Sequence, residues 1–527
     1  MTRRAAQTSF RSRCWRVVRW AGLAAAAPAL WACTSRTLES PAITPTATLT
    51  ANVTQKINNN IDILFMVDNS SSMTSMQQKL AAQLPAFMQV LEQLPNGLPN
   101  VHIAVVSSDM GAPGDQASSN SIGCTALGNE GKFQSSVGAA ATMCSSTTLA
   151  QGATFISDVD GQKNFTDPIE DVFQCIAQLG STGCGFEHQL ASIDRALGAD
   201  GSPPPDTNAN FLRPEAYLGI VLLTNEDDCS APTNTPLFSL NGGKQSITNP
   251  LGPIANYRCN EYGHVCKDSG GNMVTPPLNP PGSGSPPTLT LSDCHSNEAG
   301  GQNNLTPVQK FVSDIKALKP DPNNQILVAA IAAPVAPYTI EWVAPVPPPP
   351  GATGEIWPQV MHSCGAAGGD DVNPMPAMTT TDGSFGDPGV RIADFVNSFQ
   401  NSILASVCET SYKPSIQNIA AKLGALIKPN CITGKIQNDP NNNNRPMCAV
   451  VNHLTDSSGN MMDIAVPNCD ASNNATPCWT LNPDQTACPN GGVALKLMQD
   501  QASMNAASLS STVDCSICLP GSTAPGC

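Results

Sequence analysis

The clearest chemical signal in this sequence is an acidic residue followed by alternating hydroxyls, in the run Asp68-Asn69-Ser70-Ser71-Ser72. Asp68, Ser70 and Ser72 are spaced two residues apart, so one carboxylate and two hydroxyl groups can present oxygen atoms to a single point. Such oxygens suit Mg²⁺, Mn²⁺ or Ca²⁺, whereas zinc prefers nitrogen and sulfur ligands. Taken alone, the same run could be a plain helix N-cap, in which Ser70 or Ser72 needs no metal.

Two later loops carry polar side chains that could lie near this run. Residues 180–185 read GSTGCG and place the hydroxyl of Thr182 on a loop bracketed by glycines. Residues 224–228 read TNEDD and offer carboxylates directly after an apolar run. Each loop is a weak signal by itself, and only its position in the fold decides whether it belongs to the same site.

The elements around these loops alternate between strands and helices. Near-continuous apolar runs predict buried strands over residues 61–67, 102–106, 218–223 and 325–331. Apolar residues at helical spacing predict helices over residues 76–94 (kinked at Pro85), 186–197, 306–319, 391–405 and 415–427. This alternation predicts an α/β fold with a doubly wound, mostly parallel sheet. Ligands of such sheets bind at the carboxyl ends of the strands, where residues 68–72 and 224–228 fall.

An Asp-x-Ser-x-Ser turn, a Thr loop and an acidic loop, in that order, resemble the von Willebrand factor A-type (vWA) domain, a Rossmann-like fold with a metal-ion-dependent adhesion site. The resemblance covers residues 58–428 once disulfide-bearing insertions near 110–170, 229–303 and 334–390 are set aside. It implies an octahedral divalent cation, Mg²⁺ or Mn²⁺, with Ca²⁺ as a further option. It also implies an acidic group from a protein or glycan partner and the ligands Asp68, Ser70, Ser72, Thr182 and Asp227.

One position departs from the family pattern. vWA domains usually place an aspartate immediately after the threonine that ends the third strand, and this chain has Asn225 there. Either Asn225 ligates weakly through its amide oxygen, or Asp227 takes the role. We expect Asp227 to do so, with Glu226 and Asp228 behind it.

The N-terminus has the pattern of a targeting segment. Residues 1–20 contain six arginines, and residues 21–32 form an apolar run too short to span a membrane. The run ends in Leu30-Trp31-Ala32-Cys33, which resembles a bacterial lipobox; we expect a lipoprotein signal peptide over residues 1–32 and acylation of Cys33. Residues 33–57, rich in Thr, Pro and Ser, would then be a tether. The alternative is ordinary cleavage near Ala32 and release of the protein.

The cysteine content indicates an oxidising compartment. Eighteen of the 20 cysteines follow Cys33 and predict up to nine structural disulfides. Eight of them lie in residues 429–527, which have little helical periodicity and predict a separate disulfide-rich C-terminal module. Histidines beside cysteines at residues 264–266, 294–295 and 362–364 mimic zinc-ligand spacing, and Cys515-x-x-Cys518 mimics a redox motif; disulfides account for these patterns better.

The charge balance narrows the class of partner. The net charge is −15, and without the leader arginines it is −21. This excess of acid argues against nucleic acid and against membrane binding other than through a lipid anchor. The words GCGFEHQL and LLTNEDDCS, together with the lipobox, most resemble the secreted vWA lipoproteins of myxobacteria.

The sequence therefore predicts a lipid-anchored protein of the cell envelope, at the outer membrane or cell surface, that binds a protein or glycan through a divalent cation. We expect no enzymatic turnover. Two alternatives stay open. One is a structural surface protein whose metal site is degenerate, as Asn225 suggests. The other is a periplasmic hydrolase with Asp68 or Ser70 as the nucleophile, for which the sequence shows no recognisable base.

Overall fold

The computed structural model describes residues 50–94, 97–112, 124–135, 149–239, 246–282, 287–299, 304–344, 355–365, 383–427, 431–455, 460–469, 476–483, 488, 492–498, 500, 503 and 508–527. The expected signal peptide, Cys33 and the first part of the expected tether lie outside these residues. Every structural statement below concerns the described part of the chain.

A seven-stranded sheet forms the centre of the molecule, in the order β15-β10-β6-β2-β3-β4-β5. The strands from β15 to β3 are parallel, and β4 and β5 extend the sheet in antiparallel orientation. The bounds are Asn60–Val67 (β2), Asn100–Ser107 (β3), Ile156–Val159 (β4), Gln162–Lys163 (β5), Tyr217–Leu223 (β6), Ile326–Ala332 (β10) and Asn401–Ser406 (β15). The predicted α/β fold with a mostly parallel sheet is confirmed.

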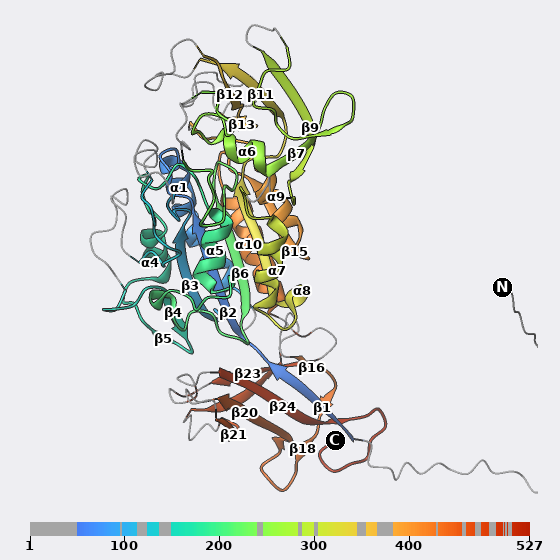
Figure 1. Cartoon of the computed structure of the whole chain (residues 1–527). Coiled ribbons are helices and arrows are strands. Elements are labelled where there is room, and N and C mark those ends of the chain that lie inside the picture. Colours follow the sequence, from blue (N-terminus) through green and yellow to red (C-terminus); the bar gives the residue numbers. More distant parts are fainter. Residues whose placement is uncertain are drawn as a thin grey trace, which may run out of the picture.

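Helices cover both faces of this sheet (Figure 1). One face carries α1 (Thr74–Ala81), α2 (Leu84–Glu92), α4 (Ile169–Ile176) and α10 (Lys413–Leu426); the other carries α5 (Gln189–Leu197), α7 (Val308–Ala317) and α9 (Val390–Asn397). Along β2, Ile63 and Phe65 belong to the first core, and Leu64 and Met66 belong to the second. Successive strand side chains point to opposite faces, so an unbroken apolar run supplies both cores.

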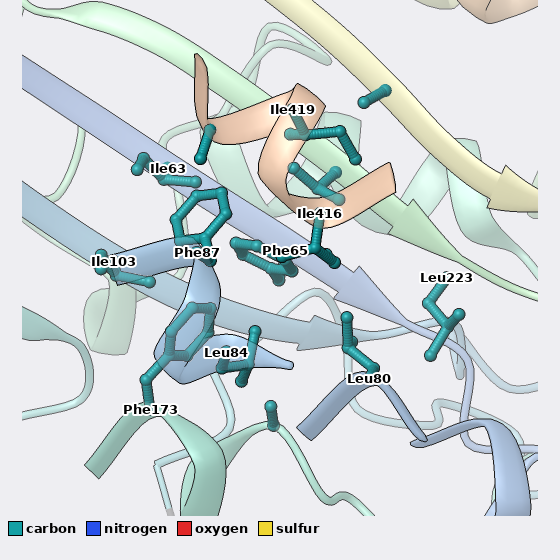
Figure 2. Packing of buried hydrophobic residues seen from close by; sticks show 14 of the residues in the cluster. Ile63, Phe65, Leu80, Leu84, Phe87, Ile103, Phe173, Leu223, Ile416 and Ile419 are labelled. Carbon is teal, nitrogen blue, oxygen red and sulfur yellow. The ribbon is translucent and has the colours of Figure 1, made fainter. Parts of the chain in front are cut away.

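The first core fixes the strand that leads into the expected site. Figure 2 shows Phe65 of β2 beside Phe87 of α2 and Phe173 of α4. The ring centroids are 5.6 Å and 4.8 Å apart, and both pairs meet edge to face. Such pairs contribute about 0.5–1.5 kcal/mol each beyond the area they bury. The packing of Phe65 against α2 and α4 therefore fixes the position of the carboxyl-terminal part of β2.

Two predicted helices differ from the structure. The predicted helix over residues 76–94 is two helices, because α2 begins at Leu84 with Pro85 in its first turn. Proline has no N–H to donate inside a helix, and it fits the first turn. The predicted helix over residues 391–405 is wrong in its second half, since α9 ends at Asn397 and β15 follows as the parallel partner of β10. A short apolar run fits either state, and pairing with β10 decides between them.

The second and third insertions fold together into one small antiparallel sheet, ordered β12-β11-β9-β7-β8. Its strands are His264–Lys267 (β7), Met273–Val274 (β8), Thr288–Ser296 (β9), Tyr338–Val343 (β11) and Trp357–Val360 (β12), and α6 (Tyr257–Gly263) precedes β7. Trp342 and Tyr338 are buried in its core, beside the Cys266–Cys294 disulfide. We call this unit the insertion sheet; it lies beyond the carboxyl ends of the central strands (Figure 1).

The C-terminal residues form a separate module of small antiparallel sheets, as expected. Its strands are Cys431–Ile432 (β16), Lys435–Ile436 (β17), Asn438–Asp439 (β18), Arg445–Pro446 (β19), Cys448–Thr455 (β20), Met461–Val466 (β21), Cys478–Pro483 (β22), Val493–Met498 (β23) and Ser508–Cys518 (β24). Shorter elements elsewhere are the 3-10 helix Asp206–Asn208, α8 (Pro322–Gln325), β13 (Cys364–Gly365) and β14 (Phe385–Gly386).

The expected tether does not stay free along its whole length. Residues Thr50–Ile57 form strand β1, which pairs antiparallel with β24 from Thr50↔Cys518 to Ile57↔Ser511. The N-terminal segment thus adds a strand to the C-terminal module before the chain enters β2 (Figure 1). Strand β1, which precedes the domain boundary expected at residue 57, therefore shares a sheet with the C-terminal strand β24.

Seven disulfides are described, and they staple both the insertions and the C-terminal module. They join Cys124–Cys184, Cys229–Cys259, Cys266–Cys294, Cys364–Cys408, Cys448–Cys515, Cys469–Cys478 and Cys518–Cys527. Cys175 and Cys488 are disulfide-bonded as well. Among the described helices, none has the length and apolar character needed to cross a membrane.

Candidate metal centre

The first and third predicted loops meet where the strand order reverses. β2 lies between β3 and β6 in the sheet. The chain first adds β3, β4 and β5 on one side of β2 and then adds β6, β10 and β15 on the other side. Asp68 follows β2 directly, and its backbone N–H donates to the carbonyl of Leu223 at the end of β6, at 2.9 Å. This is the switch point at which open α/β sheets bind ligands.

Asp68 joins the loops that follow three neighbouring strands. Its side chain is fully buried and accepts hydrogen bonds from the Ser70 N–H (2.8 Å), the Ser108 hydroxyl (3.1 Å) and the Thr224 hydroxyl (2.7 Å). Burial raises the pKa of Asp68, and the hydrogen bonds from Ser70, Thr224 and Ser108 oppose that rise. Asp68 is thus the residue around which the three loops are arranged.

The oxygens nearest to one another belong to Ser70, Ser72 and Asn225. The hydroxyls of Ser70 and Ser72 lie 3.5 Å apart, and Ser72 donates to the amide oxygen of Asn225 at 3.0 Å. Asn225 is completely buried, and within the described structure its amide nitrogen has no hydrogen-bond partner. The position that departs from the family pattern is therefore the one that faces the hydroxyls.

Asp227, the expected third-loop ligand, has its carboxylate engaged away from Ser70 and Ser72 in this structure. Its carboxylate accepts from His264 Nε2 at 2.6 Å and from the backbone N–H groups of Arg391 and Ile392 at 2.9 and 3.1 Å. These bonds lower the pKa of Asp227 although burial works in the opposite direction. Asp227 therefore anchors the start of α9 and the insertion sheet, and both its oxygens are engaged there.

The second loop reaches the first through its backbone. The Gly183 N–H donates to the carbonyl of Asn69 at 2.8 Å, and a Cβ at Gly183 would lie 2.3 Å from Asn69 Oδ1, so any larger residue would displace the Asn69 side chain. Thr182 itself is exposed. Among the described hydrogen bonds, none joins Thr182 to Ser70, Ser72 or Asn225. The structure thus places Thr182 beside the cluster without fixing its hydroxyl on it.

Two positioning residues escaped the sequence analysis. Buried Gln77 donates to the carbonyls of Asp68 (2.7 Å) and Gly180 (2.8 Å) and accepts from the Gly180 N–H (3.0 Å), which locks the first and second loops together. Ser108 contacts Asp68, whereas its neighbour Asp109 accepts from the Gly111 N–H instead. The place of Ser108 directly after β3 was the only signal for it in the sequence.

The donors in this cluster are hard oxygen atoms, of the kind that Mg²⁺ and Mn²⁺ prefer. Octahedral ligands at 2.0–2.1 Å from Mg²⁺ stand about 3 Å from one another, and the two oxygen spacings of 3.5 and 3.0 Å are of this size. Ser70, Ser72 and Asn225 would hold such an ion, with Asp68 behind them. In the described residues, no group of three or more His, Cys, Asp or Glu side chains is arranged to hold a metal. The cluster is thus rich in hydroxyls and poor in carboxylates.

The patterns that mimic zinc and redox motifs are resolved by disulfides. Cys266 pairs with Cys294 and Cys364 pairs with Cys408. Cys515 and Cys518 pair with Cys448 and Cys527, not with each other. The expected structural disulfides are confirmed at these positions.

Comparisons with known proteins find only distant structural similarity. No family model matches the chain, and no curated protein matches it. Three solved structures that resemble it are the pilus adhesin RrgA from Streptococcus pneumoniae, the human COPII-coat protein Sec24c, and three N-terminal domains of the type V pili tip protein Mfa5 from Porphyromonas gingivalis. Their identities are 10%, 8% and 11%, and their TM-scores are 0.22, 0.23 and 0.25.

The alignments cover 90%, 88% and 92% of this chain and 59%, 44% and 66% of those chains, so it spans less than two thirds of their lengths. Similarity this low says nothing about activity. The strand order and helix layers described above carry the fold. The chain is an α/β protein with a mostly parallel central sheet covered by helices on both faces, several disulfides and a Cys-rich antiparallel C-terminal module.

Proposed function

We propose that this protein is an extracytoplasmic binding protein whose vWA-like domain presents a divalent cation, Mg²⁺ or Mn²⁺, to an acidic group of a protein or glycan. The single observation that carries the proposal is the convergence of the Ser70, Ser72 and Asn225 oxygens at the switch point of the sheet. When bound, the cation would supply the positive charge that an acidic ligand needs. The disulfides support a location outside the cytoplasm.

The placement of the cluster favours binding to a large partner. It lies at the carboxyl ends of the strands, below the insertion sheet and at the opposite end of the domain from the C-terminal module (Figure 1). The module instead faces the amino ends of β2 and β3, across a cleft of about 590 Å³ lined by Asn59, Leu98, Leu495 and Leu497. A ligand at the cluster would not meet the module, and the insertion sheet would form one wall of the binding surface.

The hydrolase alternative receives no support from the described contacts. The described hydrogen bonds of the Asp68 and Ser70 side chains involve backbone N–H groups and hydroxyls, and no histidine. A nucleophile needs a base within hydrogen-bond reach. The proposal is therefore limited to a binding protein, with a working or a degenerate metal site.

Metal binding to the full mature chain tests the proposal. Ser70→Ala/Ser72→Ala should abolish the rise in melting temperature that Mn²⁺ gives the wild type, and Ser71→Ala, at an exposed neighbour, should leave it intact. Binding of a ligand at 100 times its Kd stabilises the native state by about 2.7 kcal/mol. A wild type that ignores Mn²⁺ and Mg²⁺ would mean a degenerate site and a structural role.

We also propose that Cys33 carries a lipid anchor. This proposal rests only on the lipobox-like sequence that ends at Cys33. Labelled palmitate should enter the wild-type protein and not Cys33→Ser. Equal labelling of both proteins, or a mature form soluble without detergent, would contradict the anchor.

A further inference from the structure

A small cavity beside the candidate metal centre is lined by five acidic side chains, Glu187, Glu226, Asp227, Asp228 and Asp387. Its remaining walls include Asn256, Asn260 and His264. Its free volume is about 10 Å³, which is room for one water-sized occupant. We call it the Glu187 cavity.

Three of the acids have a basic partner, and Glu187 has none in the described structure. Asp228 pairs with Arg391 at 2.9 Å, Asp227 lies 2.6 Å from His264, and Asp387 lies 2.6 Å from His362. Glu187 is only 2% exposed, and its Oε1 has no hydrogen-bond partner among the described residues. A buried carboxyl oxygen that has lost its water costs free energy until a donor or a cation reaches it.

Like charges surround Glu187. Burial raises the pKa of Glu187 well above its ordinary value, and the nearby carboxylates of Glu226 and Asp68 raise it further. Neither arginine nor histidine relieves this repulsion, since Arg391 and His264 are engaged by Asp228 and Asp227. A single cation at the cavity would offset the charge of both glutamates.

The walls of the cavity are fixed to one another before any ion arrives. The Cys229–Cys259 disulfide joins the acidic loop to α6. A second link between the same two segments is the hydrogen bond that the Asn256 amide donates to the Glu226 carboxylate, at 2.6 Å. The Cys229 N–H also donates to the Glu187 carbonyl at 2.7 Å, which holds the third wall. Ligands placed on such a braced frame lose little entropy on binding.

We propose that the Glu187 cavity binds one Ca²⁺ ion, held by the carboxylates of Glu187 and Glu226, each of which can offer two oxygens, and by the amide oxygen of Asn260. The donors are hard oxygens, which excludes the softer metals. Mg²⁺ keeps several of its waters and demands regular octahedral geometry, whereas Ca²⁺ accepts an irregular protein cage, and the cavity has room for one small occupant. The inference does not depend on the Ser70, Ser72 and Asn225 cluster.

Calcium titration of the mature chain, stripped with a chelator, tests this site by calorimetry and by melting temperature. The wild type should bind Ca²⁺ in the cavity, and Glu187→Gln should weaken that binding at least tenfold. This substitution keeps the shape of the side chain and removes a buried carboxyl group that is costly to ionise, so the variant should fold with the same disulfides. The control is Glu92→Gln, at an exposed acid of α2, which should bind as the wild type does.

The variant Ser70→Ala/Ser72→Ala separates the two sites. It should keep the Ca²⁺ site that Glu187→Gln loses, whatever happens to its response to Mn²⁺. Equal Ca²⁺ affinity in folded Glu187→Gln and in the wild type, or no Ca²⁺ binding by the wild type, overturns the proposal. Loss of all Ca²⁺ binding in Ser70→Ala/Ser72→Ala also overturns it, because the ion would then belong to the first cluster.

Discussion

Ser72 and Asn225 lie 153 residues apart in the sequence and are joined by a hydrogen bond of 3.0 Å between the serine hydroxyl and the amide oxygen. This contact brings the loop after β2 against the loop after β6. Because the amide nitrogen of Asn225 has no partner in the described structure, the side chain is oriented by Ser72 alone. The pair therefore decides how well the candidate metal centre can hold an ion.

Asn225→Asp should raise the affinity for Mn²⁺ at least tenfold, because a carboxylate replaces an amide oxygen as the ligand that faces Ser72. Without metal the same variant should melt below the wild type, since a new negative charge lies in the loop that contacts buried Asp68. Asn210→Asp, at an exposed position, is the control for added charge. Unchanged Mn²⁺ affinity would show that Asn225 is not a ligand.

Gln77→Leu should destabilise the protein by about 2–3 kcal/mol, because the backbone groups of Asp68 and Gly180 would lose their buried partner. Metal binding should weaken as well, since Gln77 holds the first two loops in register. Gln78→Leu, on the exposed side of α1, should leave both properties near the wild-type values. Urea unfolding and Mn²⁺ titration of the two variants check this; equal stability would rule out the role given to Gln77.

The contribution of Asp194 to the free energy of unfolding should fall as the pH rises from about 4 to about 7. Burial, and then the nearby charge of Asp314, raises the pKa of Asp194 to about 7, and Lys310 lowers it less. The native state therefore holds a proton that the unfolded chain releases near pH 4, so each step upward through this window costs native stability.

Asp194→Asn should accordingly be more stable than the wild type at pH 8, by about 2 kcal/mol, and no more stable at pH 3. Thermal unfolding at both pH values measures the difference. Asp200→Asn, less buried and bonded mainly to its own turn, should change little. A gain that is the same at both pH values would assign the effect to packing rather than to titration.

Removal of residues up to 57 should loosen the C-terminal module. The truncated chain lacks all eight pairs between β1 and β24, from Thr50↔Cys518 to Ile57↔Ser511. We expect a loss of about 3 kcal/mol or more for the module, seen as earlier proteolysis of residues 431–527. A chain that begins at residue 50 is the matched control, and identical proteolysis of the two would show that β1 adds nothing to the module.

The strands and the first loop could be predicted because their signals are local. The unbroken apolar run of β2 needs two covered faces, and Asp68 stands at its end. β15 could not be distinguished from helix, since its short apolar run acquires its state only by pairing with β10. The pairing of β1 with β24 joins segments more than 450 residues apart (Thr50 with Cys518, Ile57 with Ser511), and no local pattern encodes a contact at that distance.

The ligand set was harder to predict than the fold. Any of Asn225, Glu226, Asp227 and Asp228 could face the first loop, because one residue of register changes the direction of a side chain. His264 and the start of α9, both far away in the sequence, take the carboxylate of Asp227. Glu187 gave no signal as a single acid in a loop, and its environment arises only when four segments meet.

The antiparallel pairing of β1 with β24 also sets the mechanics of the molecule. Two residues separate β1 from β2, so tension applied to the chain before Thr50 passes along β1 straight into the middle strand of the central sheet. The C-terminal module lies beside this covalent path and holds β1 through eight residue pairs with β24. A pull along β1 would load all eight pairs at once, in shear. A ligand held at the carboxyl end of β2 would thus be connected covalently to Thr50 through β2, two linking residues and β1, and the module bound along β1 would fix the direction of the pull.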